Sequence, residues 1–137
     1  MTATHTVFLH YIVLIVFLLL VLAGYRTYFA KATKMKTLKF APDGSGLSDV
    51  GYRLTRAHMN AVECFPFIGG ILIYAIATEQ TGVTDGLAHI LMAARVIQTG
   101  ILMASTSNFA IQLRFVAFLV QFGICIYWLF GFLAPLM

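Results

Sequence analysis

The stretch RLTRAHMNAVECFP, residues 53–66, leads directly into the apolar run FIGGILIYAIA, residues 67–77. In a helix, four of its polar residues recur at intervals of three and four and share one face: Arg53, Arg56, Asn60 and Glu63. Ionisable groups on a helix that enters a membrane are costly, so they usually face other protein and often carry function. Alternatively, the arginines only reach the membrane surface and the glutamate holds helices together by pairing with an arginine. The pattern leaves both interpretations open.

The composition is that of a membrane protein. Of the 137 residues, 61% are hydrophobic and only 10% are charged, whereas soluble domains carry about 25% charged residues. We expect a single transmembrane domain, residues 1–137, without a separate soluble catalytic domain. The net charge of +4 comes from basic residues at predicted helix ends and in one loop, which indicates membrane topology and no nucleic-acid binding. Cys64 and Cys125 lie in predicted spans without metal-ligand spacing, so no metal site is expected.

Four apolar runs are long enough to cross a bilayer, which takes about 20 helical residues. The predicted spans are residues 7–23, 49–78, 87–104 and 112–134. Pro66 removes one backbone donor from the second span and should kink it close to the polar cluster. The sequence therefore predicts an all-α membrane protein, a bundle of four transmembrane helices.

The connections between the spans differ in charge. The first holds four lysines, Lys31, Lys34, Lys36 and Lys39, whereas the second, residues 79–86, holds no Lys or Arg. Because cytoplasmic loops carry an excess of Lys and Arg, we expect loops one and three on the cytoplasmic side and both termini on the opposite side. The lysines either extend the first helix past the lipid headgroups or attract anionic lipids.

Arg95 lies in the middle of the third span, where it needs a partner. A charge at that depth costs at least about 2.5 kcal/mol on insertion scales, and Glu63 is the only carboxylate inside the predicted membrane interior. We therefore expect the two side chains within salt-bridge reach, directly or through a bound ligand, in one subunit or across a subunit boundary. Gln98 follows one turn after Arg95 and shares its face.

Three arginines gather at the predicted cytoplasmic ends of the second and fourth spans, Arg53, Arg56 and Arg114, with Arg95 deeper. Such a cluster predicts an anion site for a ligand that bears a carboxylate or a phosphate. A lone four-helix subunit would leave Arg95, Gln98 and the polar half of the second span short of internal partners. We therefore expect an oligomer.

At these residues the sequence resembles a known family. The pattern RxxRAHxNxxExFP, residues 53–66, is similar to the second-helix motif of the MAPEG proteins, the membrane-associated proteins in eicosanoid and glutathione metabolism. Its Glu-x-x-Pro spacing is most similar to the leukotriene-C-synthase and bacterial branches. The stretch ARVIQ, residues 94–98, resembles the third-helix motif. The four spans, the basic first loop and the length agree as well, so the resemblance covers nearly the whole chain.

The resemblance implies a homotrimer of four-helix subunits, with glutathione bound between adjacent subunits at the cytoplasmic side. Carried over by position, it assigns the glutathione-binding residues Arg53, Arg56, Asn60, Glu63, Arg95 and Gln98. Arginines bind the carboxylates of the tripeptide through paired hydrogen bonds, and Glu63 accepts from its α-ammonium group. Arg114 and Ser105 are the candidate catalytic residues, because an arginine close to the sulfur stabilises the thiolate, which is the nucleophile.

Three positions depart from the family pattern. Cys64 stands where many relatives have an aromatic or amide residue. Gln98 and Leu102 stand where relatives often have Tyr or His and Tyr, respectively, as ligand contacts. The loop before Arg114 is also longer than in the eicosanoid enzymes.

Two functions follow from these features. The first is a glutathione transferase or peroxidase that acts on lipophilic electrophiles arriving from the bilayer, with glutathione as co-substrate. The second is a non-catalytic lipid-binding or accessory subunit that keeps the trimer. The arginine, asparagine and glutamate set favours the enzyme, and the missing tyrosines favour the accessory subunit. A proton or ion path along Glu63 and Arg95 is a third interpretation, for which one buried pair is weak support.

Overall fold

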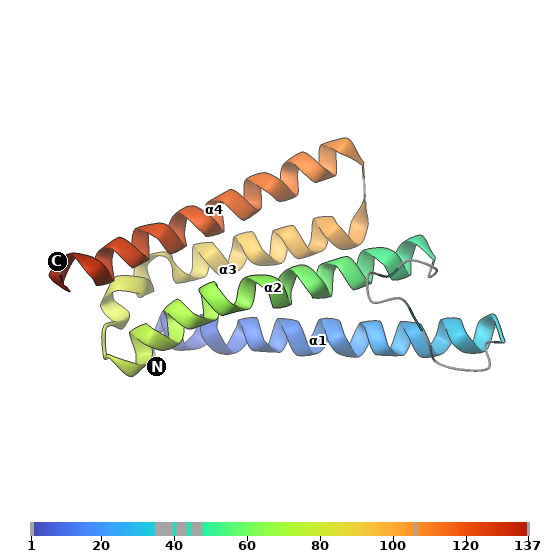
Figure 1. Cartoon of the computed structure of the whole chain (residues 1–137), viewed down its shortest axis with the longest axis horizontal. Helices are drawn as coiled ribbons and strands as arrows, with labels where there is room; N and C mark the ends of the chain where they lie inside the picture. The colour runs from blue at the N-terminus through green and yellow to red at the C-terminus, as the bar shows by residue number, and fades with distance from the viewer. Residues whose placement is uncertain (1, 35–39, 41–43, 45–47, 106, 137) are drawn as a thin grey trace.

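The computed structural model describes residues 2–34, 40, 44, 48–105 and 107–136, and four long helices make up most of them (Figure 1). They are α1 (Ala3–Ala32), α2 (Asp49–Ala77), α3 (Thr81–Ala104) and α4 (Asn108–Leu133), followed by the short 3-10 helix η1 (Ala134–Leu136). All four long helices have the length and apolar composition needed to cross a membrane. The prediction of an all-α, four-helix, multi-pass membrane protein is confirmed.

The first helix is longer than the span predicted over residues 7–23. It runs through Lys31 to Ala32, so at least this part of the lysine segment extends the helix. Lys34 follows with a left-handed backbone (φ 56°), and Lys36 and Lys39 lie outside the described residues.

The third helix begins at Thr81, six residues before the predicted start at residue 87. It begins early because Asp85 contacts α1 from within the helix. The Oδ1 of Asp85 accepts hydrogen bonds from the backbone N–H of Thr4 at 2.9 Å and from the hydroxyl of Thr4 at 2.6 Å. The carboxylate thereby satisfies donors at the N-terminus of α1, where a negative charge also interacts favourably with the helix dipole. What looked like an acidic loop is thus the first turn of α3 docked on α1.

The ends of α2 and α4 at the α1–α2 and α3–α4 connections are set by serine caps. Ser48 accepts from the N–H of Gly51 at 3.3 Å, and α2 begins at Asp49 as predicted. Ser107 accepts from the N–H of Ala110 at 3.2 Å, which starts α4 four residues before the predicted residue 112. Pro66 lies inside a continuous α2, so the lost backbone donor does not end the helix.

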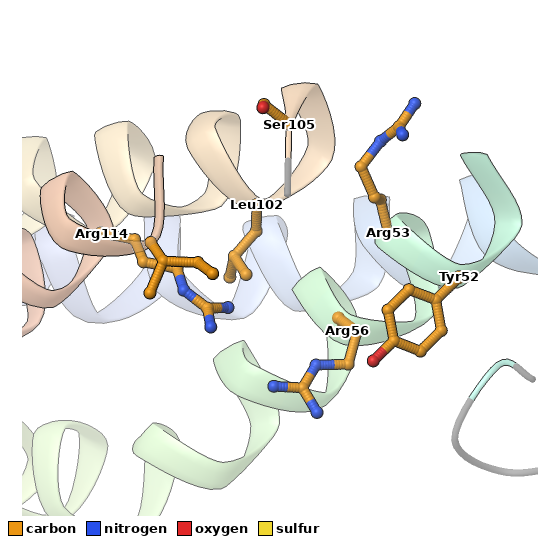
Figure 2. Close-up of a pocket in the computed structure, with 7 residues that line it drawn as sticks. Tyr52, Arg53, Arg56, Leu102, Ser105 and Arg114 are labelled. Carbon is orange, nitrogen blue, oxygen red and sulfur yellow. The ribbon is translucent and has the colours of Figure 1, made fainter. Parts of the chain in front are cut away.

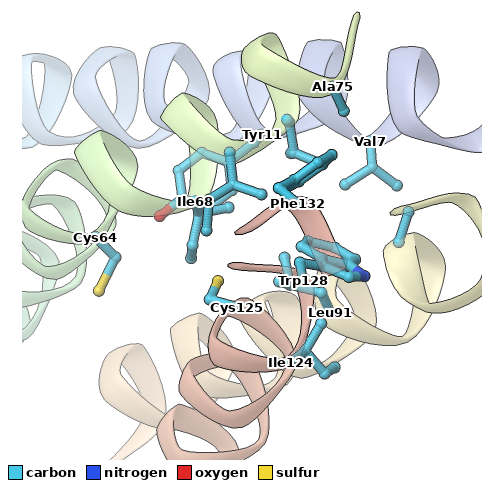
Figure 3. Packing of buried hydrophobic residues seen from close by; sticks show 13 residues of the cluster. Val7, Tyr11, Cys64, Ile68, Ala75, Leu91, Ile124, Cys125, Trp128 and Phe132 are labelled. Atoms are coloured by element: carbon cyan, nitrogen blue, oxygen red, sulfur yellow. The ribbon is translucent and has the colours of Figure 1, made fainter. Parts of the chain in front are cut away.

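The helices pack as an up-and-down bundle in which α4 lies along α3 and diverges from α2 towards the α3–α4 connection (Figure 1). Most of the apolar core lies in the half of the bundle nearer the chain ends, where Trp128, Tyr11 and Leu72 are fully buried among residues from all four helices (Figure 3). In the other half the buried cluster is smaller and lies mainly between α1, α2 and α3. Polar side chains of α2 line the space that α4 leaves there.

Candidate functional site

A groove of about 620 Å³ opens between α2 and α4 where the two helices diverge. One wall comes from α2, the other from α4, and Gln98 of α3 contributes from between them. The lining residues are Arg56, Asn60, Glu63, Cys64, Phe67, Gln98, Ile111, Gln112, Arg114, Phe115 and Phe118. The groove therefore combines cationic, anionic, amide and aromatic groups in one space.

A smaller pocket of about 150 Å³ continues the groove towards the α3–α4 connection. The two share Arg56, Ile111 and Arg114, and the pocket adds Tyr52, Arg53, Leu102 and Ser105 (Figure 2). In Figure 2 the guanidinium groups of Arg56 and Arg114 extend into the space between α2 and α4. This end of the site is consequently the cationic end.

Arg53 and Ser105 lie at the rim of this pocket. The side chain of Arg53 points away from Arg56 and Arg114 in Figure 2, and its Nε donates to the carbonyl oxygen of Met103 at 2.9 Å. Arg53 thus holds the last turn of α3, where carbonyl groups lack helical partners. The Oγ of Ser105 accepts from the backbone N–H of Ser107 at 3.1 Å, which leaves its hydroxyl proton available as a donor.

The charged groups of the groove are accessible. Arg56 and Glu63 are exposed, and Arg114 is half-buried. Arg56 and Glu63 are seven residues apart on α2, so they lie about two turns from each other along the same wall. A ligand with anionic groups at one end and a cationic group at the other would match this order of charges.

Arg95 lines neither the groove nor the pocket. It is fully buried and donates to Oδ1 of Asn60 and, at 3.5 Å, to the hydroxyl of Tyr11. The hydroxyl of Tyr11 in turn donates to the carbonyl oxygen of Ala61 at 2.7 Å. Among the described residues, the guanidinium group of Arg95 therefore donates its hydrogen bonds to uncharged oxygen atoms.

Within one subunit, Arg95 and Glu63 form no direct salt bridge, so this one of the expected arrangements is wrong, whereas a contact through a ligand or across a subunit boundary stays a prediction. Glu63 is exposed on the groove side of α2, whereas Asn60, one turn earlier, faces the bundle as well as the groove. The positions differ by three residues, and the resulting rotation around the helix is enough to separate them. Arg95 meets the amide of Asn60 because that group is the one turned inward.

The structure thus brings seven of the eight predicted site residues to the groove and its pocket and leaves Arg95 behind the wall as a support for Asn60. The sequence pattern did not indicate the other groove residues of α4 besides Arg114, which are Ile111, Gln112, Phe115 and Phe118. It also missed the role of Gln121, which donates to Gln98 at 2.6 Å. The signal for Gln121 was its position as the only polar residue in the apolar middle of α4, seven residues after Arg114.

A family model described as MAPEG family matches residues 8–134 of the chain. The match extends from α1 to the end of α4 and includes every residue of the groove and the pocket. Comparisons with curated proteins and with solved structures give no match.

Proposed function

Because the chain belongs to the MAPEG family, we propose that it is a membrane-bound glutathione transferase or peroxidase that acts on lipophilic electrophiles, with glutathione as co-substrate. The observation that carries the proposal is the groove between α2 and α4. It places two arginines at one end, a carboxylate on its wall and aromatic side chains beside them. Its volume of about 620 Å³ lies in the range of roughly 300–1,000 Å³ typical of small-molecule sites.

The charges in the groove fit the charged groups of glutathione. Arg56 presents guanidinium donors, which bind a carboxylate through paired hydrogen bonds. Glu63 accepts from the α-ammonium group of the γ-glutamyl residue of the tripeptide. Asn60 lies between these charges along α2 and supplies an amide.

Catalysis requires that the glutathione thiol lose its proton, because the thiolate is the nucleophile. We assign Arg114 to stabilise the thiolate, since it is half-buried in the groove and retains its positive charge. In the transferase reaction the sulfur forms a bond to an electrophilic carbon, and the leaving group departs with the bonding electrons. An epoxide instead opens to an alkoxide, to which the hydroxyl of Ser105 can donate a hydrogen bond, and the proton that the thiol released to water then neutralises it.

The second substrate reaches the groove from the bilayer in this proposal. Phe67, Phe115 and Phe118 line the groove next to the polar groups. Phe115 is 57% exposed on α4, and its neighbour Val116 is 57% exposed as well. An apolar molecule dissolved among lipid chains therefore meets a continuous apolar surface up to the site.

A homotrimer completes the site. In an isolated subunit the exposed Arg56 and Glu63 would face lipid across the open side of the groove, which is costly. A neighbouring subunit would cover this side and leave a space for glutathione between the subunits. The number three follows from the family resemblance.

The alternative function is a non-catalytic lipid-binding or accessory subunit. It is favoured by Gln98, whose amide oxygen and amide nitrogen both bind other side chains of the protein. Leu102 has no polar group for a ligand in the adjoining pocket. By the family resemblance, relatives often have tyrosine or histidine at the position of Gln98 and tyrosine at that of Leu102, so these two ligand contacts are absent here.

Purified protein in lipid nanodiscs separates the two functions. Isothermal titration calorimetry measures glutathione binding, and absorbance measures conjugation of glutathione to 1-chloro-2,4-dinitrobenzene. We expect binding together with conjugation above the uncatalysed rate. Binding without conjugation or peroxide reduction, tested with several electrophiles and a lipid hydroperoxide, would favour the accessory subunit. Absence of glutathione binding would contradict the enzyme.

A further inference from the structure

A chain of hydrogen-bonded side chains crosses the bundle along the wall of the groove, which two of its members, Asn60 and Gln98, line. Arg95 of α3 donates to Oδ1 of Asn60 on α2, and Nε2 of Gln98 donates to the same oxygen at 3.1 Å. Nε2 of Gln121 on α4 donates to Oε1 of Gln98 at 2.6 Å and to the carbonyl oxygen of Ala117 at 3.1 Å. The chain therefore connects α2, α3 and α4.

The direction of these hydrogen bonds is determined by Arg95. A guanidinium group has donors and no acceptor, so the atom of Asn60 that faces it must be the oxygen. The atom of Gln98 that faces this oxygen must then be the amide nitrogen. Its own oxygen is turned towards α4, where only a donor fits, and Gln121 supplies that donor. Reversing any one amide would bring two donors or two acceptors together.

As a consequence, Asn60 presents one kind of group to the groove. Its oxygen already accepts from Arg95 and Gln98, and no described residue accepts a hydrogen bond from its Nδ2. Because Asn60 lines the groove, this amide nitrogen is left as a donor to a ligand. The ligand group opposite it must be an acceptor, such as a carbonyl or carboxylate oxygen.

We propose that Gln121 is a positioning residue of the glutathione site, which acts through Gln98 to hold Asn60 as a donor towards the ligand. This inference rests on the proposed function. Gln121 is 1% exposed and lines neither the groove nor the pocket, so it cannot contact the ligand itself within this subunit. Its own Oε1 is buried without a partner among the described residues. Gln121 is therefore oriented so that its amide nitrogen donates to Gln98, at the cost of leaving the amide oxygen of Gln121 without a partner among the described residues.

The test replaces Gln121 by methionine, which has nearly the same volume and no amide. Without the donor from α4, Gln98 can rotate away and Asn60 loses one of the two bonds that orient it. We expect the dissociation constant for glutathione, measured calorimetrically in nanodiscs, to rise about five- to tenfold, the effect of about one hydrogen bond. Thr99→Val is the matched control, because it removes a buried hydroxyl without a partner from the neighbouring position on α3. It should leave the constant unchanged.

A second readout reports on Asn60 directly and needs no ligand. The chain has two asparagines, Asn60 and Asn108, so selective ¹⁵N labelling of asparagine gives two pairs of side-chain amide signals in an NMR spectrum, one pair for each residue. We expect Gln121→Met to shift the signal of Asn60 and to leave that of the exposed Asn108 in place. In the unchanged protein, glutathione should shift the signal of Asn60. This measurement tests the contact between Asn60 and the ligand, and it does not depend on whether the variant folds.

The outcomes distinguish this inference from the proposed function. If the unchanged protein binds glutathione but Gln121→Met alters neither the affinity nor the Asn60 signal, the positioning role is overturned. A shifted signal with unaltered affinity overturns it too, because the orientation of Asn60 would then be irrelevant to the ligand. If glutathione does not bind at all, the proposed function fails and the positioning role for glutathione fails with it. The ligand-free spectra would still report whether Gln121 orients Asn60.

Discussion

Arg95 of α3 donates a hydrogen bond to the amide oxygen of Asn60 on α2, so a neutral side chain rather than the carboxylate of Glu63 holds the fully buried arginine of the bundle. Tyr11 accepts a second hydrogen bond from Arg95 at 3.5 Å. Because Glu63 is not needed to neutralise Arg95, its charge remains available in the groove. The polar face of α2 is thereby divided into a part that supports the bundle and a part that faces the groove.

This division predicts unequal effects of two substitutions on α2. Asn60→Leu removes one of the two side-chain acceptors of the buried guanidinium group, and losing a hydrogen bond to a charged group costs about 1.5–3 kcal/mol. Glu63→Gln changes an exposed side chain and should alter stability by no more than about 0.5 kcal/mol. Thermal unfolding in detergent, without glutathione, measures both. Equal destabilisation by the two variants would show that Glu63 supports Arg95 in the assembled protein.

Arg56 should contribute to binding rather than to folding. It is exposed and lines both the groove and the pocket. Arg56→Met removes a charged hydrogen-bond donor worth about 1.5–3 kcal/mol, so the dissociation constant for glutathione should rise roughly 10- to 150-fold. Lys31→Met removes one positive charge from an exposed position on α1 and serves as the control. An equal loss of affinity in the control would point to net charge instead of a specific contact.

Arg114 should determine the pH dependence of conjugation. A cation beside the glutathione sulfur favours the thiolate and lowers the pKa of the bound thiol. Arg114→Met removes that cation, so the thiol pKa rises and the pH profile of the turnover number moves to higher pH. The loss of rate should be largest at neutral pH and partly recovered in alkaline buffer. A uniform loss at every pH would assign Arg114 to substrate binding instead of thiolate stabilisation.

The arrangement of the helices predicts how single cysteines react on the two sides of the membrane. Glu79 lies in the α2–α3 turn and Ser107 in the α3–α4 connection, at opposite ends of the bundle, and both are exposed (Figure 1). Cys64 and Cys125 are buried, at 5% and 2% exposure, and should react slowly. From the charge of loop one, we expect Ser107→Cys to be labelled from the cytoplasm and Glu79→Cys from the opposite side. The reverse labelling would invert the proposed topology.

The homotrimer is tested by native mass spectrometry in mild detergent. The open side of the groove carries Arg56 and Glu63, which predicts that subunits associate over this surface. We expect the mass of three chains to predominate, and Glu63→Gln to retain the trimer because it keeps the shape of the groove wall. Monomers alone, in several detergents, would contradict the proposed assembly and the site between subunits.

Local features of the sequence were sufficient to predict how many membrane helices the chain forms and roughly where they lie. The length of the apolar runs predicted four spans, and the second of them was predicted to begin at residue 49, where α2 begins. The starts of α3 and α4 were predicted too late. Asp85 is in the helix because it caps α1, and that long-range contact leaves no mark on the local pattern. The periodicity of α2 correctly gathered Arg56, Asn60 and Glu63 on the groove side.

The sequence by itself thus determined that the chain forms membrane helices and which face of α2 is polar, because both depend on residues close together in the chain. Only the tertiary structure decided which partner Arg95 meets, since that depends on how α3 is rotated against α2. It also decided that Tyr11 of α1 and Gln121 of α4 join the hydrogen-bonded chain. The contact between Tyr11 and Arg95 joins residues that are more than 80 positions apart in the sequence. A buried guanidinium group binds the acceptors that packing brings within reach. Here the neutral amide of Asn60 is such an acceptor, so Arg95 has a partner without a carboxylate.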